Sequence, residues 1–414
     1  MTTALVLSRL SPFDSQRVHA VYQRLGTQVE ALGRVVERVV CLFLVPPDQQ
    51  CTADELKEHE ERLRRLWSPC LSLRLAPVVS LDEPLSAWQR IGRGIFDFRA
   101  QSIARPLDNP RAIAAVDAAL QEQPALILAH RLSSMSVLMR LASTVRTRRV
   151  FFDMDDIEHI ALRRRLLHDP SWPRERLLLL QTPRLMLAEF QAVRLAAATF
   201  VCSEADRRYL ARFTGSERVH TVPNSVELPP LNEGDTSELL VIFVGSMSSR
   251  PNAHAVDTLV QKIWPSVRAR VPGARLAIIG SSAQLTESYP SHDPSVSFLG
   301  FVEDLESWYR RARVVCCPIY HGAGTRVKII EAAAHAKAVV STHLGAEGLN
   351  FQDGREIVLR DAPEELARAC VQMLHHADAA AQLGRAARER ARNSYDRSAV
   401  VEQLARIVRT GLHR

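Results

Sequence analysis

The sequence has little lysine, few aromatic residues and no long hydrophobic run. Lysines number four among 53 basic residues, and aromatic residues make up 6% of the chain. No nucleic-acid-binding motif is recognisable, and the low aromatic content agrees with that absence. The longest apolar run, near Val39–Val45, is much shorter than a membrane span. The segment Thr2–Leu7 is too short for the apolar core of a signal peptide, so we expect neither leader nor membrane helix.

The cysteines give no sign of a metal site or of disulfide bonds. Seven cysteines occur, an odd number, and no CxxC pair is present. We therefore expect no structural zinc site. We expect the protein to work in a reducing, cytoplasmic compartment. Small apolar thiols inside strands are ordinary core residues, which is how we interpret Cys202, Cys316 and Cys317.

The formal net charge is +7, and arginine supplies nearly all of the basic side chains. Two interpretations stay open. One is a compositional bias towards Arg and Ala. The other is attraction to polyanionic substrates or to an anionic membrane, which would bring a cytoplasmic protein into peripheral contact with the inner membrane face. The candidate basic patches are Arg62–Arg65 and Arg163–Arg165.

Short apolar strands alternate with helical segments along the whole chain, which predicts an α/β protein with parallel sheets covered by helices. Two halves each begin with such a strand. In the first half we expect strands at Ala4–Ser8, Val35–Val45, Ala125–Ala129, Arg149–Asp153, Thr199–Cys202 and Val219–Val222. In the second half we expect them at Leu239–Val244, Ala274–Ile279, Val296–Leu299, Val314–Pro318, Ala338–Thr342 and Glu356–Leu359.

At 414 residues the chain has room for two domains of ordinary size. The segment Pro223–Ser237 is rich in Pro, Asn and Ser and lacks an apolar period, so it predicts a linker. We therefore expect two doubly wound, Rossmann-like domains, residues 1–225 and 238–396, joined by 226–237 and facing a central cleft. A final helix at 397–414 is expected to pack back on the first domain.

The segment Val314–Leu349 is the most informative of the chain. An apolar strand is followed by a Gly-rich turn and an amphipathic helix with Arg326, Lys328 and Glu331. Free backbone N–H groups at a helix N-terminus attract phosphate, and the two cations strengthen that attraction. The turn lacks the third glycine of a dinucleotide fingerprint, and no acidic residue ends the next strand. The segment thus predicts a site for a diphosphate, with Glu331 accepting ribose hydroxyls.

With its neighbours this segment resembles the donor-binding half of family 4 of the retaining glycosyltransferases (glycosyl transferases group 1). The matching blocks are TVPNSVEL (Thr221–Leu228), FVGSMSSRPNAHAVDTLVQKIWP (Phe243–Pro265), RLAIIG (Arg275–Gly280), VSFLGFVEDLESWY (Val296–Tyr309) and GAGTRVKIIEAAAHAKAVVSTHLGAEGL (322–349). The resemblance implies the two-domain GT-B fold. It also implies retaining, metal-independent transfer of a hexosyl group from a nucleotide-diphosphate sugar, which is a co-substrate and not a cofactor. The acceptor would be a glycan, a lipid-linked glycan or a small molecule of a pathway such as polysaccharide synthesis.

The resemblance also assigns roles to residues. It implies catalytic roles for His130, Arg326 and Lys328. It implies donor contacts for a larger set, which comprises Gly245, Arg250, Phe301, Val302, Gly322, Gly324, Thr325 and Glu331. Three features depart from the family pattern. Ala323 stands where many members carry a glutamate, Ser246 stands where an arginine is frequent, and Ser8–Arg17 replaces a Gly-Gly loop near the acceptor. A non-catalytic nucleotide-sugar-binding partner subunit and a nucleotide-sugar epimerase therefore stay open as alternatives.

A second dense group of polar residues follows the strand that ends near Asp153. Asp153, Asp155, Asp156 and Glu158 are predicted on one loop at the carboxyl edge of the first sheet, with His159 beside them. An acidic run next to a histidine suggests a metal ion. The family resemblance instead implies contacts with the acceptor and no metal, and helix capping is the remaining interpretation.

Overall fold

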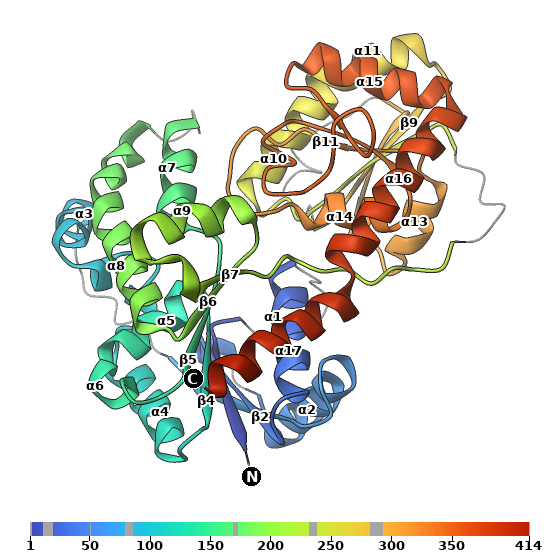
Figure 1. The fold of residues 1–414 in the computed structure, drawn as a ribbon. Helices are drawn as coiled ribbons and strands as arrows, with labels where there is room; N and C mark the ends of the chain where they lie inside the picture. Colours follow the sequence, from blue (N-terminus) through green and yellow to red (C-terminus); the bar gives the residue numbers. More distant parts are fainter. Residues whose placement is uncertain are drawn as a thin grey trace. The chain divides into compact units, whose positions relative to one another are not determined.

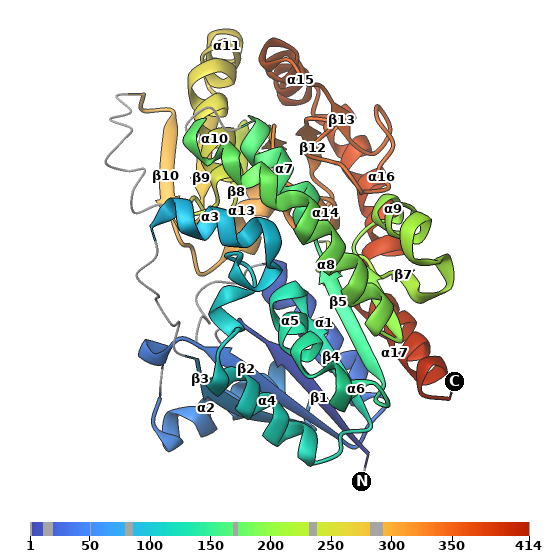
Figure 2. The ribbon, with the colours of Figure 1, turned by 90° about the vertical axis from the view of Figure 1, so that its left-hand side faces the viewer.

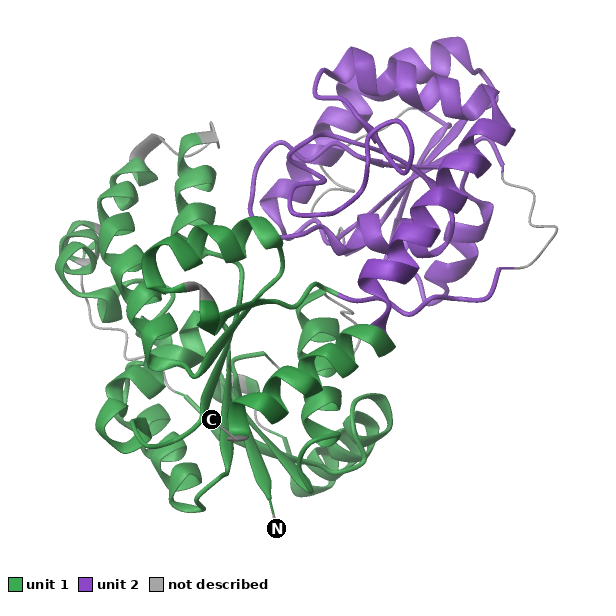
Figure 3. Cartoon of the chain, viewed as in Figure 1, with its two compact units in different colours: residues 1–224, 398–414 green, residues 225–397 purple. Residues whose placement is uncertain are grey.

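In a computed structural model the chain forms two compact units, residues 1–224 with 398–414, and residues 225–397 (Figure 3). The structure describes residues 2–10, 20–49, 51–78, 86–168, 173–231, 238–281 and 293–413. Most of the Ser8–Arg17 loop and the end of the expected linker lie outside the described residues. Each unit is a parallel sheet with helices on both faces, the doubly wound architecture that the alternating pattern predicts.

Unit 1 contains a seven-stranded sheet in the order β3-β2-β1-β4-β5-β6-β7. Its strands are β1 (Thr3–Ser8), β2 (Arg38–Val45), β3 (Leu71–Pro77), β4 (Leu126–His130), β5 (Val150–Asp155), β6 (Ala198–Val201) and β7 (Val219–Thr221). The strand β3 is absent from our sequence-based expectations. It lies at the sheet edge, contains no Val or Ile, and alternates buried with half-buried side chains around Arg74. Such a strand has a weak sequence signal.

Helices cover both faces of this sheet, with α1, α2 and α17 on one side and α4, α5 and α8 on the other (Figure 1). The α-helices of the unit are α1 (Ala20–Gly33), α2 (Ala53–Leu66), α3 (Ala87–Phe96), α4 (Pro110–Gln121), α5 (Arg131–Arg140), α6 (Ala142–Val145), α7 (Glu158–His168), α8 (Thr182–Leu195), α9 (Glu204–Thr214) and α17 (Arg397–His413). The 3-10 turns are η1 (Pro47–Gln49), η2 (Phe98–Ala100), η3 (Arg105–Leu107), η4 (Pro173–Gln181) and η5 (Ser216–Arg218).

The last helix, α17, belongs to unit 1 although it follows unit 2 in the chain. Its apolar side chains Val401, Leu404 and Val408 are buried in the same core as Leu25 of α1 and Phe151 of β5. Burial of such a stripe follows from the helical spacing of these apolar residues. The first unit is therefore built from both ends of the chain.

Unit 2 contains a six-stranded sheet in the order β10-β9-β8-β11-β12-β13, and Figure 2 shows β10, β9 and β8 side by side. The strands are β8 (Leu240–Val244), β9 (Arg275–Ile279), β10 (Val296–Gly300), β11 (Val314–Cys317), β12 (Ala338–Ser341) and β13 (Val358–Leu359). The helices are α10 (Arg250–Thr258), the π-turn η6 (Leu259–Ile263), α11 (Trp264–Arg270), α13 (Leu305–Arg311), α14 (Val327–Ala334), α15 (Pro363–His375) and α16 (Ala377–Tyr395). Because helices cover both faces of this sheet, its strands are continuous apolar runs, which is why the sequence predicts them.

The strand order of unit 2 reverses direction at β8. The chain moves outwards from β8 to β9 and β10, and then returns to place β11 on the other side of β8. In open parallel sheets, ligands bind beyond the carboxyl ends of the strands at such a reversal. The loops that follow β8 and β11 are therefore where a ligand of unit 2 is expected. None of the helices among the described residues is long and apolar enough to cross a membrane.

Candidate functional site

Three glycine-containing turns meet at the carboxyl edge of the sheet in unit 2. Gly245 ends β8 and its N–H donates to Ile279 O at 2.8 Å, while the Gly280 N–H donates to Gly300 O at 2.7 Å. Gly280 has φ +141°, and a Cβ there would lie 2.0 Å from Gly245 O. Only glycine tolerates both that dihedral angle and that proximity. The turns after β8, β9 and β10 are thus joined into one rigid edge.

Lys328, in the first turn of α14, reaches across to the turn after β8. Its Nζ donates to Asn252 Oδ1 at 2.7 Å and lies 4.2 Å from the centre of the Phe243 ring. The Asn252 amide in turn donates to Ser246 O at 2.8 Å. A Cβ on Gly245 would lie 2.5 Å from Lys328 Nζ, so this glycine leaves the space that the amine occupies. The predicted cation is therefore held at the strand-order reversal by an amide and an aromatic face.

The surroundings of Lys328 weaken its hold on the proton. Burial, together with the neighbouring Arg326 guanidinium, lowers the pKa of its ammonium to about 8, against the opposing effects of Cys317 and Glu331. The side chain is half-buried, and burial disfavours the charged form. A diphosphate brought to the amine would restore the ordinary preference for the charged form. The site is therefore electrostatically prepared for an anion.

Arg326 immediately precedes α14 and folds back on the Gly-rich turn. Its Nη1 donates to the carbonyls of Ala323 and Gly324. Gly322 has φ +112°, and a Cβ there would lie 3.1 Å from Arg326 Nη2. In this structure Arg326 organises the turn 322–325 that our sequence analysis assigned to the donor. The guanidinium stays beside Lys328 and adds positive charge to the same place.

Other predicted donor residues surround this centre. Phe301 follows β10 with 56% of its surface exposed, and Val302 packs against the core beside it. Arg250 begins α10 and is exposed, whereas Thr325 lies half-buried in the Gly-rich turn. Glu331 lies one helical turn beyond Lys328 and accepts a hydrogen bond from Tyr309 at 3.3 Å. The structure thus assembles the predicted donor residues around the ends of β8, β10 and β11.

Our sequence analysis missed Asn252 and Tyr309. Both lie in the recognised blocks, but nothing in their spacing predicts the contacts with Lys328 and Glu331. Helices α10 and α13 each precede a different strand, and only the folded sheet brings their side chains to α14. No local sequence signal could therefore have identified them.

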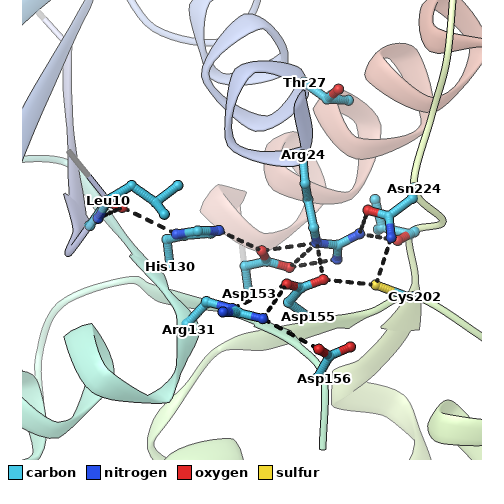
Figure 4. A network of polar contacts seen from close by, with 12 residues as sticks. Leu10, Arg24, Thr27, His130, Arg131, Asp153, Asp155, Asp156, Cys202 and Asn224 are labelled. Atoms are coloured by element: carbon cyan, nitrogen blue, oxygen red, sulfur yellow. Dashed lines mark hydrogen bonds and ion pairs between the residues drawn. The ribbon is translucent and has the colours of Figure 1, made fainter. Parts of the chain in front are cut away.

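The second group of candidates forms a buried network in unit 1 (Figure 4). Arg24 of α1 binds Asp153 with its Nε at 3.0 Å and its Nη2 at 2.5 Å, and its Nη1 donates to Val222 O at 2.9 Å. Asp153 is fully buried and Asp155 nearly so. Both lie within β5 and not on a loop as expected, because β5 extends to Asp155. The role that these contacts show is structural: two carboxylates hold one buried guanidinium.

Asp155 also links this network to the next helix. Arg131, at the start of α5, contacts Asp155 Oδ2 at 3.0 Å and Asp156 Oδ2 at 3.3 Å. Cys202 Sγ donates to Asp155 Oδ1 at 3.2 Å. The arginines and His130 together lower the pKa of Asp155 against the opposing effect of burial, which is the larger single influence. The carboxylate therefore stays ionised inside the unit.

His130 ends β4 and is buried beside Asp153. Its Nδ1 lies 3.2 Å from Ser8 Oγ, and its Nε2 lies 3.8 Å from Asp153 Oδ2. Burial lowers the pKa of His130 to about 4, so the imidazole is neutral near pH 7. The hydroxyl of Ser8 also accepts from the N–H of Leu10 at 3.1 Å. His130 is thereby tied to the start of the loop after β1.

Glu158, like Asp156, is a candidate that keeps access to solvent. It lies half-buried in the first turn of α7, and burial together with Asp156 and Glu189 raises its pKa to about 7, opposed by Arg131. The buried Glu189 accepts the Glu158 N–H at 2.7 Å and contacts His159 Nδ1, and His159 Nε2 lies 2.8 Å from Tyr209 OH. The Glu189 carboxylate thus caps α7 by accepting the backbone N–H groups of Glu158 and His159. The described residues contain no group of three His, Cys, Asp or Glu able to hold a metal ion.

Known proteins resemble this chain in sequence and in fold. Residues 238–376 match the family model of the glycosyl transferases group 1. The phosphatidyl-myo-inositol mannosyltransferase of Mycolicibacterium smegmatis is 27% identical over 275 residues, covering 59% of this chain and 70% of that protein. Sucrose-phosphate synthase from Thermosynechococcus elongatus superposes with a TM-score of 0.71 at 18% identity, covering 99% of both chains. HepE from Anabaena, solved with UDP-glucose, superposes with a TM-score of 0.65 at 15% identity, covering 99% and 100%. The superpositions show the GT-B fold.

Proposed function

We propose that this chain, a glycosyltransferase of the GT-B type, moves a hexosyl group from a uridine-diphosphate sugar to an acceptor with retention at the anomeric carbon and without a metal ion. The observation that carries the proposal is Lys328, held at the strand-order reversal by Asn252 and Phe243, with Glu331 on the same helix. The HepE structure with UDP-glucose supports uridine as the base. Retention and metal independence rest on the resemblance to family 4.

The chemistry needs charge stabilisation more than proton transfer. As the bond from the sugar C1 to the diphosphate breaks, negative charge builds on the β-phosphate. The Lys328 ammonium, the Arg326 guanidinium and the N–H groups of the Gly-rich turn would stabilise this charge, as an oxyanion hole does. Glu331 would accept the ribose hydroxyls, and the exposed Phe301 would face the base. Mutational losses of single donors at such sites are about 10²–10³ in kcat.

We assign the acceptor side to unit 1. Glu158 is the best-placed of its carboxyl groups, because it is half-buried and its pKa of about 7 lets it donate or accept a proton. His130 is buried, with 1% of its surface exposed, so we propose that it acts by positioning Ser8 at the end of β1, and the donor contact that the resemblance implies for it stays a prediction. The three aspartates would act indirectly, by holding two arginines at the carboxyl edge of the sheet in unit 1: Asp153 and Asp155 hold Arg24, and Asp155 and Asp156 hold Arg131.

A thermal-shift panel tests the donor. A specific ligand raises the melting temperature by mass action, so UDP and UDP-sugars are expected to stabilise the protein more than GDP and its sugars. Product analysis with the stabilising donor and candidate acceptors then tests transfer. Conversion of the donor alone into an isomer would instead show an epimerase, and binding without transfer to any acceptor would show a non-catalytic partner subunit.

Lys328→Ala tests the site directly. We expect turnover to fall by about 10²–10³ with the melting temperature of the free protein little changed, because the residue stabilises charge and not the core. Lys262→Ala, which alters an exposed lysine of the π-turn η6, is the matched control and is expected to keep full turnover. Near-normal turnover of Lys328→Ala would remove Lys328 from the mechanism.

A lipid-linked acceptor at a membrane surface is favoured by helix α3. Trp88 and Phe96 of α3 are 71% and 82% exposed. The helix is held instead through its backbone, because Gln181 donates to Ile91 O at 3.0 Å and Gln101 donates to Gly94 O at 2.7 Å. Exposed aromatic side chains on a helix of a basic protein suit the interface of an anionic bilayer. The name of the mycobacterial relative, a phosphatidyl-myo-inositol mannosyltransferase, also indicates a lipid acceptor.

Vesicle flotation tests this part of the proposal. The wild-type protein is expected to float with vesicles rich in an anionic phospholipid and to be released by high salt, which screens charge. A Trp88→Ala, Phe96→Ala double variant is expected to lose flotation, whereas Phe213→Ala, which alters an exposed phenylalanine of α9, keeps it. Equal flotation of both variants would exclude α3 as the contact.

A further inference from the structure

Tyr309 is a fully buried phenol in the donor unit whose hydroxyl meets a carboxylate. It lies in α13 with 1% of its surface exposed, and its O–H donates to Glu331 Oε2 at 3.3 Å. Burial, and then Glu331 itself, raise the pKa of Tyr309 well above its usual range. The phenol therefore stays protonated and acts towards this carboxylate as a donor.

The ring of Tyr309 is fixed from the other side by His335. The two rings are stacked, with 4.5 Å between their centres and an angle of 12° between their planes. Burial, together with the nearby cations Lys337, Arg388 and Arg310, lowers the pKa of His335 to about 4. The imidazole is consequently neutral near pH 7. It serves as a flat packing surface and does not compete with Tyr309 for Glu331.

The ends of the two helices are also tied together. Lys337 Nζ donates to Arg310 O at 2.7 Å, which joins the end of α13 to the turn after α14. Arg388 of α16 donates to Ala334 O at the end of α14, and to Pro229 O at 2.6 Å. The distance between α13 and α14 is thus fixed close to where Tyr309 meets Glu331. The phenol has a defined position and not merely a buried one.

We propose that Tyr309 is the positioning residue that holds the Glu331 carboxylate in the orientation needed to accept the two hydroxyls of a nucleotide ribose. The inference rests on the proposed function, in which Glu331 binds the ribose of the donor. A carboxylate offers about four lone-pair directions; the bond from Tyr309 uses one of them, and a diol needs two. Fixing the side chain before the ligand arrives removes an ordering cost from binding.

A merely structural role for the hydroxyl makes a different prediction. If the Tyr309 O–H only makes its own hydrogen bond inside the core, its removal weakens the binding of every nucleotide equally, through the stability of unit 2. If it positions Glu331, removing it affects only ligands that possess ribose hydroxyls. The pair UDP and 2′,3′-dideoxy-UDP separates these cases, because the two differ only in those hydroxyls.

The experiment is calorimetric titration of wild-type protein and Tyr309→Phe with both ligands. The variant keeps the ring that stacks on His335. We expect its Kd for UDP to rise about fivefold to tenfold, within the range for losing an ordinary hydrogen bond, while its Kd for the dideoxy analogue stays unchanged. Tyr395→Phe is the matched control: Tyr395 is buried in the same unit, but its hydroxyl accepts from the Asn350 N–H at 2.7 Å. It is expected to keep the wild-type ratio of the two Kd values.

The double variant Tyr309→Phe, Glu331→Gln shows whether the effect passes through the carboxylate. In the Glu331→Gln background, Tyr309→Phe is expected to change neither Kd further. A Tyr309→Phe protein that weakens both ligands by the same factor, or neither, would overturn the positioning role. A wild-type protein that binds both ligands equally would instead refute the ribose role of Glu331, which belongs to the proposed function. The variant and the wild-type protein thus report on separate claims.

Discussion

The lowered pKa of Lys328 makes donor binding dependent on pH in a defined direction. Burial and Arg326 reduce this pKa to about 8, which is within the range where the protein can be handled. The ammonium is present below pH 8 and lost above it. Since only the charged form attracts a diphosphate strongly, affinity should be complete near pH 7 and fall as the pH rises through 8.

The magnitude follows from the fraction of charged amine. With a pKa of about 8, roughly nine-tenths of the Lys328 side chains are charged at pH 7 and roughly one-tenth at pH 9. If the neutral form contributes no attraction, the apparent Kd for UDP rises about tenfold across that interval. Binding also draws a proton onto the amine, and at pH 8 the uptake is expected to be about half a proton for each UDP bound.

Titration calorimetry measures both quantities. The Kd for UDP is determined from pH 7 to 9, and proton uptake is obtained at pH 8 from buffers of different ionisation enthalpy. Lys328→Met provides the dependence that belongs to the nucleotide alone. Asn252→Asp places a carboxylate 2.7 Å from the amine in place of the amide oxygen, so its profile should shift to higher pH. A wild-type profile that matches Lys328→Met, with no proton uptake, would refute the reasoning.

The remaining predictions concern close packing and buried charge. Gly245→Ala places a Cβ 2.5 Å from the Lys328 amine and 2.8 Å from the Asn252 amide, which must both shift, so UDP affinity should fall about tenfold, or about 1.4 kcal/mol, with little change in melting temperature. Gly280→Ala meets the Gly245 carbonyl at 2.0 Å with φ +141°, so thermal unfolding should show lost stability before any effect on binding is measurable. Arg24→Ala leaves the buried Asp153 without its cation and should cost about 3–5 kcal/mol in chemical unfolding of unit 1, whereas an unchanged unfolding midpoint would show that the pair is not needed.

Much of the architecture was predictable from local pattern. Short apolar strands and intervening helices predicted two parallel sheets, and the GT-B neighbours confirm that fold. All six strands of unit 2 were expected, because strands buried on both faces are continuous apolar runs. The edge strand β3 was missed, because it contains no β-branched residue and its alternating pattern includes the charged Arg74.

The residues of the candidate site also fall into those that local sequence predicts and those that only the fold brings together. The sequence by itself determined that a Gly-rich turn, two cations and a carboxylate lie together at residues 322–331, because they are adjacent in the chain and share one helix start, and their role in donor binding stays a prediction. Tertiary structure decided everything that needs two distant segments. Asn252 is 76 residues from Lys328, and Tyr309 is 22 residues from Glu331. Arg24 is 129 residues from Asp153 and 131 from Asp155. Only strand order and helix packing bring such groups together, and those depend on burial summed over a whole unit.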